Sequence, residues 1–115
     1  MSCGNNVNLG VFTVGEIPAP LEYQYLDWDG VPIDLTAGFT AKFNWTRVGA
    51  TAAPTANAAM SDAALGKVLY TWTGAEFLQP GNYRAQFIVG NGTQRWFSDM
   101  ITWTTRVGVG TVPTI

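Results

Sequence analysis

The sequence predicts an all-β fold, an immunoglobulin-like antiparallel β-sandwich of about seven strands. Two runs carry this prediction, Val68–Trp72 and Tyr83–Val89, because apolar side chains occupy every second position in both. Between them, the Gln-Pro-Gly-Asn segment at 79–82 favours a chain reversal, since Pro fixes its own φ and Gly accepts a positive φ. A chain of 115 residues is expected to form one domain with a single core.

The other expected strands follow at the spacing typical of a sandwich. They are the segments 7–14 (broken by Gly10), 21–27, 31–35, 39–46 and 96–105. Asp29-Gly30 and Gly90-Asn91-Gly92 predict tight turns, and Pro32 suits an edge strand. We therefore expect the sandwich to span residues 9–105, with an N-terminal arm at 1–8 and a C-terminal arm at 106–115.

One segment departs from this regular spacing of strands. Residues 49–64 are rich in Ala and Thr and nearly uncharged, and Pro54 together with the lack of apolar periodicity predicts a long, ordered loop at best. Two interpretations stay open: the loop packs against another subunit, or it is disordered.

The composition limits the classes of partner. Hydrophobic residues make up 47% of the chain and charged residues only 12%, a balance more common where neighbouring molecules cover much of the surface. The net charge is −2 and the six basic residues are scattered along the sequence, which argues against nucleic acid as a partner. No apolar run is long enough to span a bilayer, and the first residues lack the pattern of a signal peptide, so no membrane association is expected.

The sequence also lacks the residue sets of the usual enzymes. It contains no His, and its only cysteine, Cys3, has no basic neighbour to activate the thiol. Asp27-Trp28-Asp29-Gly30, with Asp34 beyond it, resembles a calcium loop but lacks the closing Glu of an EF-hand, so a hairpin turn is favoured. We expect no catalytic residue, no metal and no cofactor.

The tryptophans divide into two groups. Trp45, Trp72 and Trp103 share the phase of the apolar residues of their strands and are expected in the core. Trp28, in a turn, and Trp96 beside Phe97 are candidates for exposure, and exposed aromatic side chains suit either a protein interface or a bound sugar. The interface candidates are Trp28, Trp96, Phe97 and three valines of the C-terminal arm, Val107, Val109 and Val112.

Three motifs, in this order, resemble the immunoglobulin-like N-terminal domain of phage baseplate upper proteins. They are the segment Tyr25–Thr36, with its Asp-Gly turn and Ile-Asp-Leu-Thr end, the segment Gly66–Thr73, and the segment Pro80–Phe87. The resemblance covers about residues 10 to 103. The chain departs from that family by ending after the domain.

The resemblance implies a non-enzymatic structural subunit of a tailed bacteriophage particle, in the tail or baseplate, a connector or a capsid decoration. Its expected partners are other virion proteins and copies of itself, and its expected location is the virion, assembled in the cytoplasm of the bacterial host. The alternative is a carbohydrate-binding module that attaches to a cell-surface glycan.

Overall fold

Eight β-strands and two short 3-10 helices make up the described part of the chain, in which no α-helix occurs. The structure is a computed structural model that describes residues 7–51 and 53–110. Its elements are β1 (Val7–Thr13), β2 (Leu21–Gln24), β3 (Thr40–Arg47), β4 (Thr55–Asp62), η1 (Ala63–Leu65), β5 (Lys67–Tyr70), η2 (Ala75–Phe77), β6 (Gly81–Gly90), β7 (Arg95–Phe97) and β8 (Ile101–Arg106). The fold is all-β and of the immunoglobulin-like sandwich class, as predicted.

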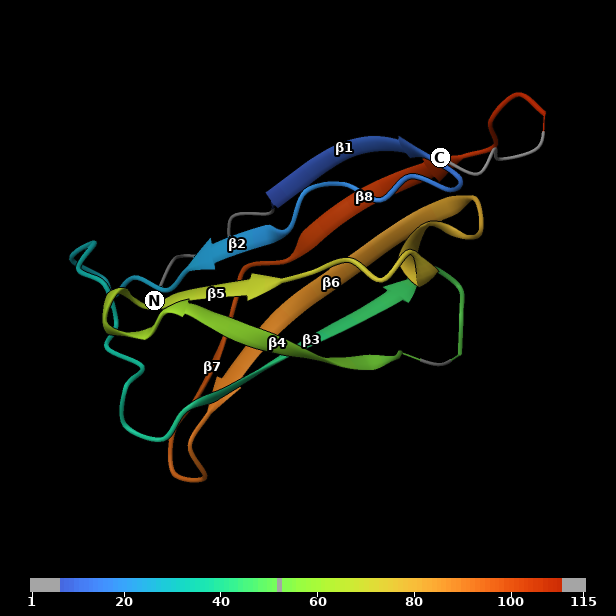
Figure 1. Cartoon of the computed structure of the whole chain (residues 1–115). Helices are drawn as coiled ribbons and strands as arrows, with labels where there is room; N and C mark the ends of the chain where they lie inside the picture. Colours follow the sequence, from blue (N-terminus) through green and yellow to red (C-terminus); the bar gives the residue numbers. More distant parts are fainter. Residues whose placement is uncertain (1–6, 52, 111–115) are drawn as a thin grey trace.

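The strands form two layers around one core (Figure 1). The larger layer has the order β1-β8-β6-β3, and β7 pairs with the last three residues of β6. The smaller layer contains β2 and β5, which are antiparallel. β1 and β8 run parallel to each other, so the sheet is mixed rather than purely antiparallel.

β4 connects the two layers. Its first half, Thr55–Ala58, lies beside β3, and its second half, from Ala59, pairs with β5. The expectation of a long loop at 49–64 is therefore wrong. Every second residue from Ala56 to Met60 packs against the core, but Ala and Asn give little hydrophobic contrast along a strand, and this hid the alternation.

Aromatic rings from both layers meet in the core. Phe43 of β3 is fully buried, and its ring centroid lies 4.1 Å from that of Tyr70 on the opposite layer and 4.9 Å from that of Phe87. Trp72 and Trp103 form a second contact across the layers, with ring centroids 5.4 Å apart. Ring pairs at such distances contribute roughly 0.5–1.5 kcal/mol each beyond the area that they bury.

The predicted core residues are buried. Trp72, Tyr83, Phe87 and Trp103 are each at most 6% exposed, which confirms the phase assigned from the alternating pattern. The third tryptophan expected in the core, Trp45, is only half-buried and lies at the margin.

Two features of the connections between strands stabilise the sandwich. The Tyr83 hydroxyl donates a hydrogen bond of 2.6 Å to the carbonyl of Gln79, the tyrosine corner of immunoglobulin-like domains. Gly66 has a φ of 69°, and a Cβ there would lie 2.6 Å from the carbonyl oxygen of Ile33. Only glycine allows this close approach between two backbone segments.

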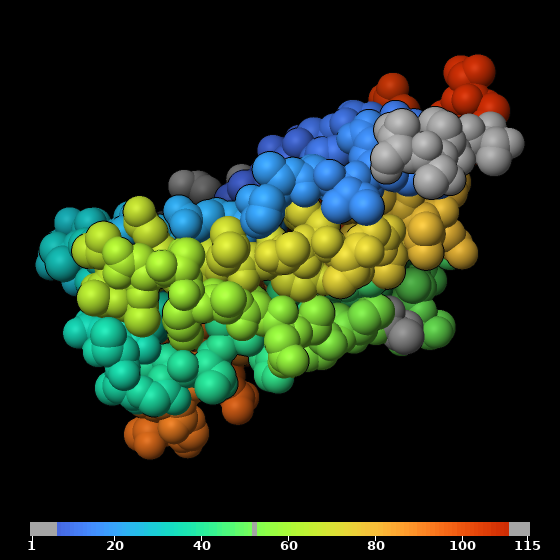
Figure 2. Space-filling model, in the orientation of Figure 1, coloured from blue at the N-terminus to red at the C-terminus, as the bar shows by residue number. Residues whose placement is uncertain are grey.

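The molecule is elongated, with principal extents of 47 × 27 × 25 Å. The connection 26–39 projects at one end of the long axis and residues 107–110 at the other (Figures 1 and 2). Both expected arms begin or end inside a strand: β1 begins at Val7, and Arg106 belongs to β8, where its carbonyl accepts a 2.8 Å hydrogen bond from the amide of Val14. Residues 1–6 and 111–115 of the expected arms lie outside the described residues.

The burial of Phe87 leads to a stability prediction. Phe87→Ala should lower the free energy of unfolding by roughly 3–5 kcal/mol, because it removes a fully buried ring and leaves a cavity. Phe97→Ala is the matched control, since Phe97 is 41% exposed and should change the value far less. Chemical denaturation measures both, and equal losses would contradict the assignment of the two faces.

Candidate interaction surface

A rigid turn presents Trp28 at one end of the molecule. The amide of Asp27 donates to the carbonyl of Val31, and the Asp27 Oδ1 accepts the amides of Asp29 and Val31 at 2.9 and 3.0 Å. Gly30 completes the turn with a φ of 78°. Trp28 is 76% exposed, so the turn holds a large apolar side chain out in solvent.

Two carboxylates of this region, those of Asp27 and Asp34, accept hydrogen bonds from neighbouring residues of the same connection. The Asp34 Oδ1 accepts hydrogen bonds from the hydroxyl and the amide of Thr36, and these bonds hold the pKa of that carboxyl below its ordinary value. Among residues 7–51 and 53–110, no group of three acidic, His or Cys side chains is placed to hold a metal ion.

Strand alternation separates the other two aromatic candidates. Trp96 lies opposite Val89 and is half-buried against the core, whereas Phe97 lies opposite Ile88 and is exposed on the outer face. The expectation that both are exposed is wrong for Trp96. The cause is the β-conformation of residues 95–97, which sends adjacent side chains to opposite faces.

The C-terminal candidates lie at the other end of the long axis. Val107 is 75% exposed and Val109 is fully exposed, and both follow the end of β8. Val112 lies outside the described residues.

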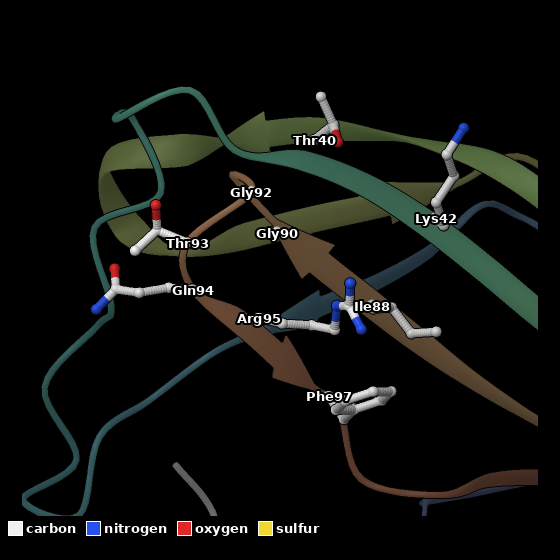
Figure 3. A pocket seen from close by; sticks show the side chains of 9 residues that line it. All are labelled: Thr40, Lys42, Ile88, Gly90, Gly92, Thr93, Gln94, Arg95 and Phe97. Carbon is white, nitrogen blue, oxygen red and sulfur yellow. The ribbon is translucent and has the colours of Figure 1, made fainter.

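A hollow on the outer face of the larger layer has no direct signal in the sequence. It has a volume of about 630 Å³ and lies over β3, β6 and β7 (Figure 3). Its walls are the side chains of Lys42, Ile88, Arg95 and Phe97, with Thr40 and the β6–β7 turn at one side. Thr40 and Lys42 lie 46 to 57 positions before Ile88, Arg95 and Phe97 in the sequence, and strand pairing brings the two groups together. Each of these side chains occupies the outward phase of its own strand.

The most deeply buried carboxyl group has a structural role. Glu76 is fully buried beside the core, where its two oxygens accept hydrogen bonds from the Tyr70 hydroxyl, the Thr73 hydroxyl and the amides of Thr73 and Gly74. Burial and the bond to Glu76 raise the pKa of Tyr70. The group thus closes the turn before β6, a role that the sequence analysis missed.

The described residues, 7–51 and 53–110, include no helix with the length and apolar character needed to cross a membrane.

Glu76→Ala should lower the free energy of unfolding by roughly 2–4 kcal/mol, because it leaves several buried donors without an acceptor. Glu22→Ala, on the exposed side of β2, should change it by less than about 0.5 kcal/mol. Thermal and denaturant unfolding compare the two variants. A loss no larger for Glu76 than for Glu22 would show that this carboxyl group contributes nothing to the turn.

The turn at Asp27 makes a second prediction. Millimolar Ca²⁺ should leave the melting temperature unchanged, since a ligand stabilises only a native state that binds it. The Oδ1 atoms of Asp27 and Asp34 already accept hydrogen bonds that shape their own turns, and no group of three acidic side chains in the described ranges is placed to hold an ion. A reproducible rise in melting temperature that Asp29→Ala removes would overturn the interpretation as a turn.

Comparison with known proteins finds no matching family model and no similar curated protein.

Proposed function

We propose that this chain is a non-enzymatic structural subunit of a tailed bacteriophage particle that acts through contacts with copies of itself and with other virion proteins. The observation that carries the proposal is the pair of segments with exposed apolar side chains at opposite ends of one elongated sandwich, the connection 26–39 and the segment 107–110 (Figure 1). The first contains Trp28 and Val31, and the second contains Val107 and Val109. Surfaces of this kind are typical of sites that other proteins cover.

A rigid body with apolar contacts at both ends suits repeated assembly. Head-to-tail contacts between identical subunits close into rings or continue as stacks, and each weak contact is strengthened when many copies engage together. The core keeps the domain rigid, because aromatic rings of the two layers pack against each other.

The motifs shared with phage baseplate upper proteins support the same proposal through structural roles. Asp34 fixes a turn through Thr36, Leu35 after it is buried, Gly66 allows a close backbone contact, and Tyr83 forms the tyrosine corner. All four roles build the domain, so the resemblance concerns a scaffold rather than a reaction.

The carbohydrate-binding alternative receives less support. A flat sugar site needs aromatic faces side by side, whereas Trp96 is half-buried, Phe97 lies on the outer face, and Trp28 belongs to a turn in another part of the chain.

Truncation tests the proposal. Deleting residues 107–115 should leave the melting temperature of the isolated domain nearly unchanged, because β8 ends at Arg106. The truncated protein should be absent from purified particles assembled in a host that supplies it in place of the intact chain, as measured by mass spectrometry. Leu65→Ser, which alters an exposed apolar residue on η1, is the control and should be incorporated normally.

Normal incorporation of the truncated protein would show that the C-terminal segment makes no essential contact. Absence of the intact chain from purified particles would refute the proposed function itself.

A further inference from the structure

Charge is segregated in this fold although it is scattered along the sequence. The strands β1, β3, β6, β7 and β8 contain five of the six basic residues and no Asp or Glu. One of the five, Arg47, bonds to Gln79 at the end of β3. The other four occupy outward positions of the larger layer: Lys42, Arg84, Arg95 and Arg106. The ammonium group of Lys42 also donates a hydrogen bond to the side-chain oxygen of Asn57 on β4.

Strand register places two of these cations at the hollow. Lys42 is opposite Ile88 on β6, and Ile88 is opposite Phe97 on β7, so the three side chains share the outer face. Arg95, opposite Gly90, extends over the same surface (Figure 3). The hollow thus combines an apolar floor with two cations, and in the described part of the chain no carboxylate lines it.

The turn at Trp28 has the complementary chemistry. It carries the exposed indole between Asp27 and Asp29, and Asp34 follows in the same connection, so this tip is acidic and apolar where the hollow is basic and apolar. The carboxylate of Asp29 has no bonding partner among residues 7–51 and 53–110, which leaves it available to a neighbour. No residue of the tip lines the hollow of its own chain.

We propose that the acidic tip of one copy docks into the basic hollow of a second copy, with Trp28 against Phe97 and Ile88 and with the Asp29 carboxylate beside Arg95 and Lys42. This inference rests on the proposed assembly function and assigns to it one pair of complementary surfaces. An indole on a fixed turn loses little conformational entropy on binding, and buried aromatic side chains dominate the energy of many interfaces.

The size and spacing of the surface favour a protein tip over a nucleic acid. The hollow lies within the roughly 300–1,000 Å³ of sites that enclose a compact group. Arg84 and Arg95 are separated by the length of about six strand residues, roughly 20 Å. That density of cations is low for a duplex that carries a charge about every 1.7 Å.

Exchange of charges across the contact tests the inference. Sedimentation velocity should show concentration-dependent association of the intact protein that weakens with added salt. Asp29→Lys alone and Arg95→Glu alone should each weaken this association roughly tenfold or more. A mixture of the two variants should associate again, because it contains two matching pairs. The unaltered tip of the Arg95→Glu variant fits the unaltered hollow of the Asp29→Lys variant, and the two altered surfaces fit each other with their charges exchanged.

The matched controls reverse the charge of an acidic and a basic side chain that lie outside the proposed contact. Glu22→Lys on β2 and Arg106→Glu at the far end of the outer face should leave association unchanged. Trp28→Ala should weaken it while the melting temperature stays constant, since Trp28 is exposed in the isolated domain. All variants are first shown to retain the intact protein's circular dichroism and melting temperature.

Three outcomes would overturn the inference: a monomer at every concentration, failure of the mixture to restore association, or binding of duplex DNA or a glycan at Arg95 without self-association. Each leaves the proposed function testable on its own, because incorporation into particles is measured separately. If a variant associates with itself normally but is not incorporated into particles, the substitution disrupts a contact with another virion protein and not the contact between copies.

Discussion

The interlocking of aromatic rings between the two layers is the interaction on which the fold depends. In antibody domains a disulfide joins the sheets, with its second cysteine two residues after the corner tyrosine. Here that position is Ala85, and the chain contains a single cysteine. Phe43 stacks on Tyr70 across the layers, and the ring centroids of Trp72 and Trp103 lie 5.4 Å apart across the same boundary, so packing of rings joins the sheets in place of a covalent bond.

Because the fold depends on an aromatic core, much of it could be predicted from the sequence. A core of large rings requires large side chains at every second position, so the phases of Val68–Trp72, Tyr83–Val89 and the segment around Trp103 could be read directly from the sequence. The turns were equally clear, because each combines a side-chain acceptor, Asp27 or Asn91, with a glycine at positive φ, Gly30 or Gly92. At these positions the residue types alone were sufficient to predict the local structure.

Other features depended on relations that no local pattern contains. β4 changes partner from β3 to β5 along its length, and its small side chains suffice only because the neighbouring rings fill the core. The basic hollow forms where β3, β6 and β7 become neighbours, although these strands are distant or separated by a turn in sequence. Trp96 and Phe97 were assigned to one surface, and the strand at 95–97 placed them on two.

The separation of core and surface has a consequence for function. Stability resides in rings that face inward, so the outer face of the larger layer could gather cations without a structural need for carboxylate partners. The carboxylates lie instead in connections, on the smaller layer, or at Glu76 within a turn. The basic hollow and the acidic tip are therefore two separate surfaces of the same molecule, and the tip does not line the hollow. Their electrostatic attraction can be satisfied between copies, which is the arrangement that a repeating assembly requires.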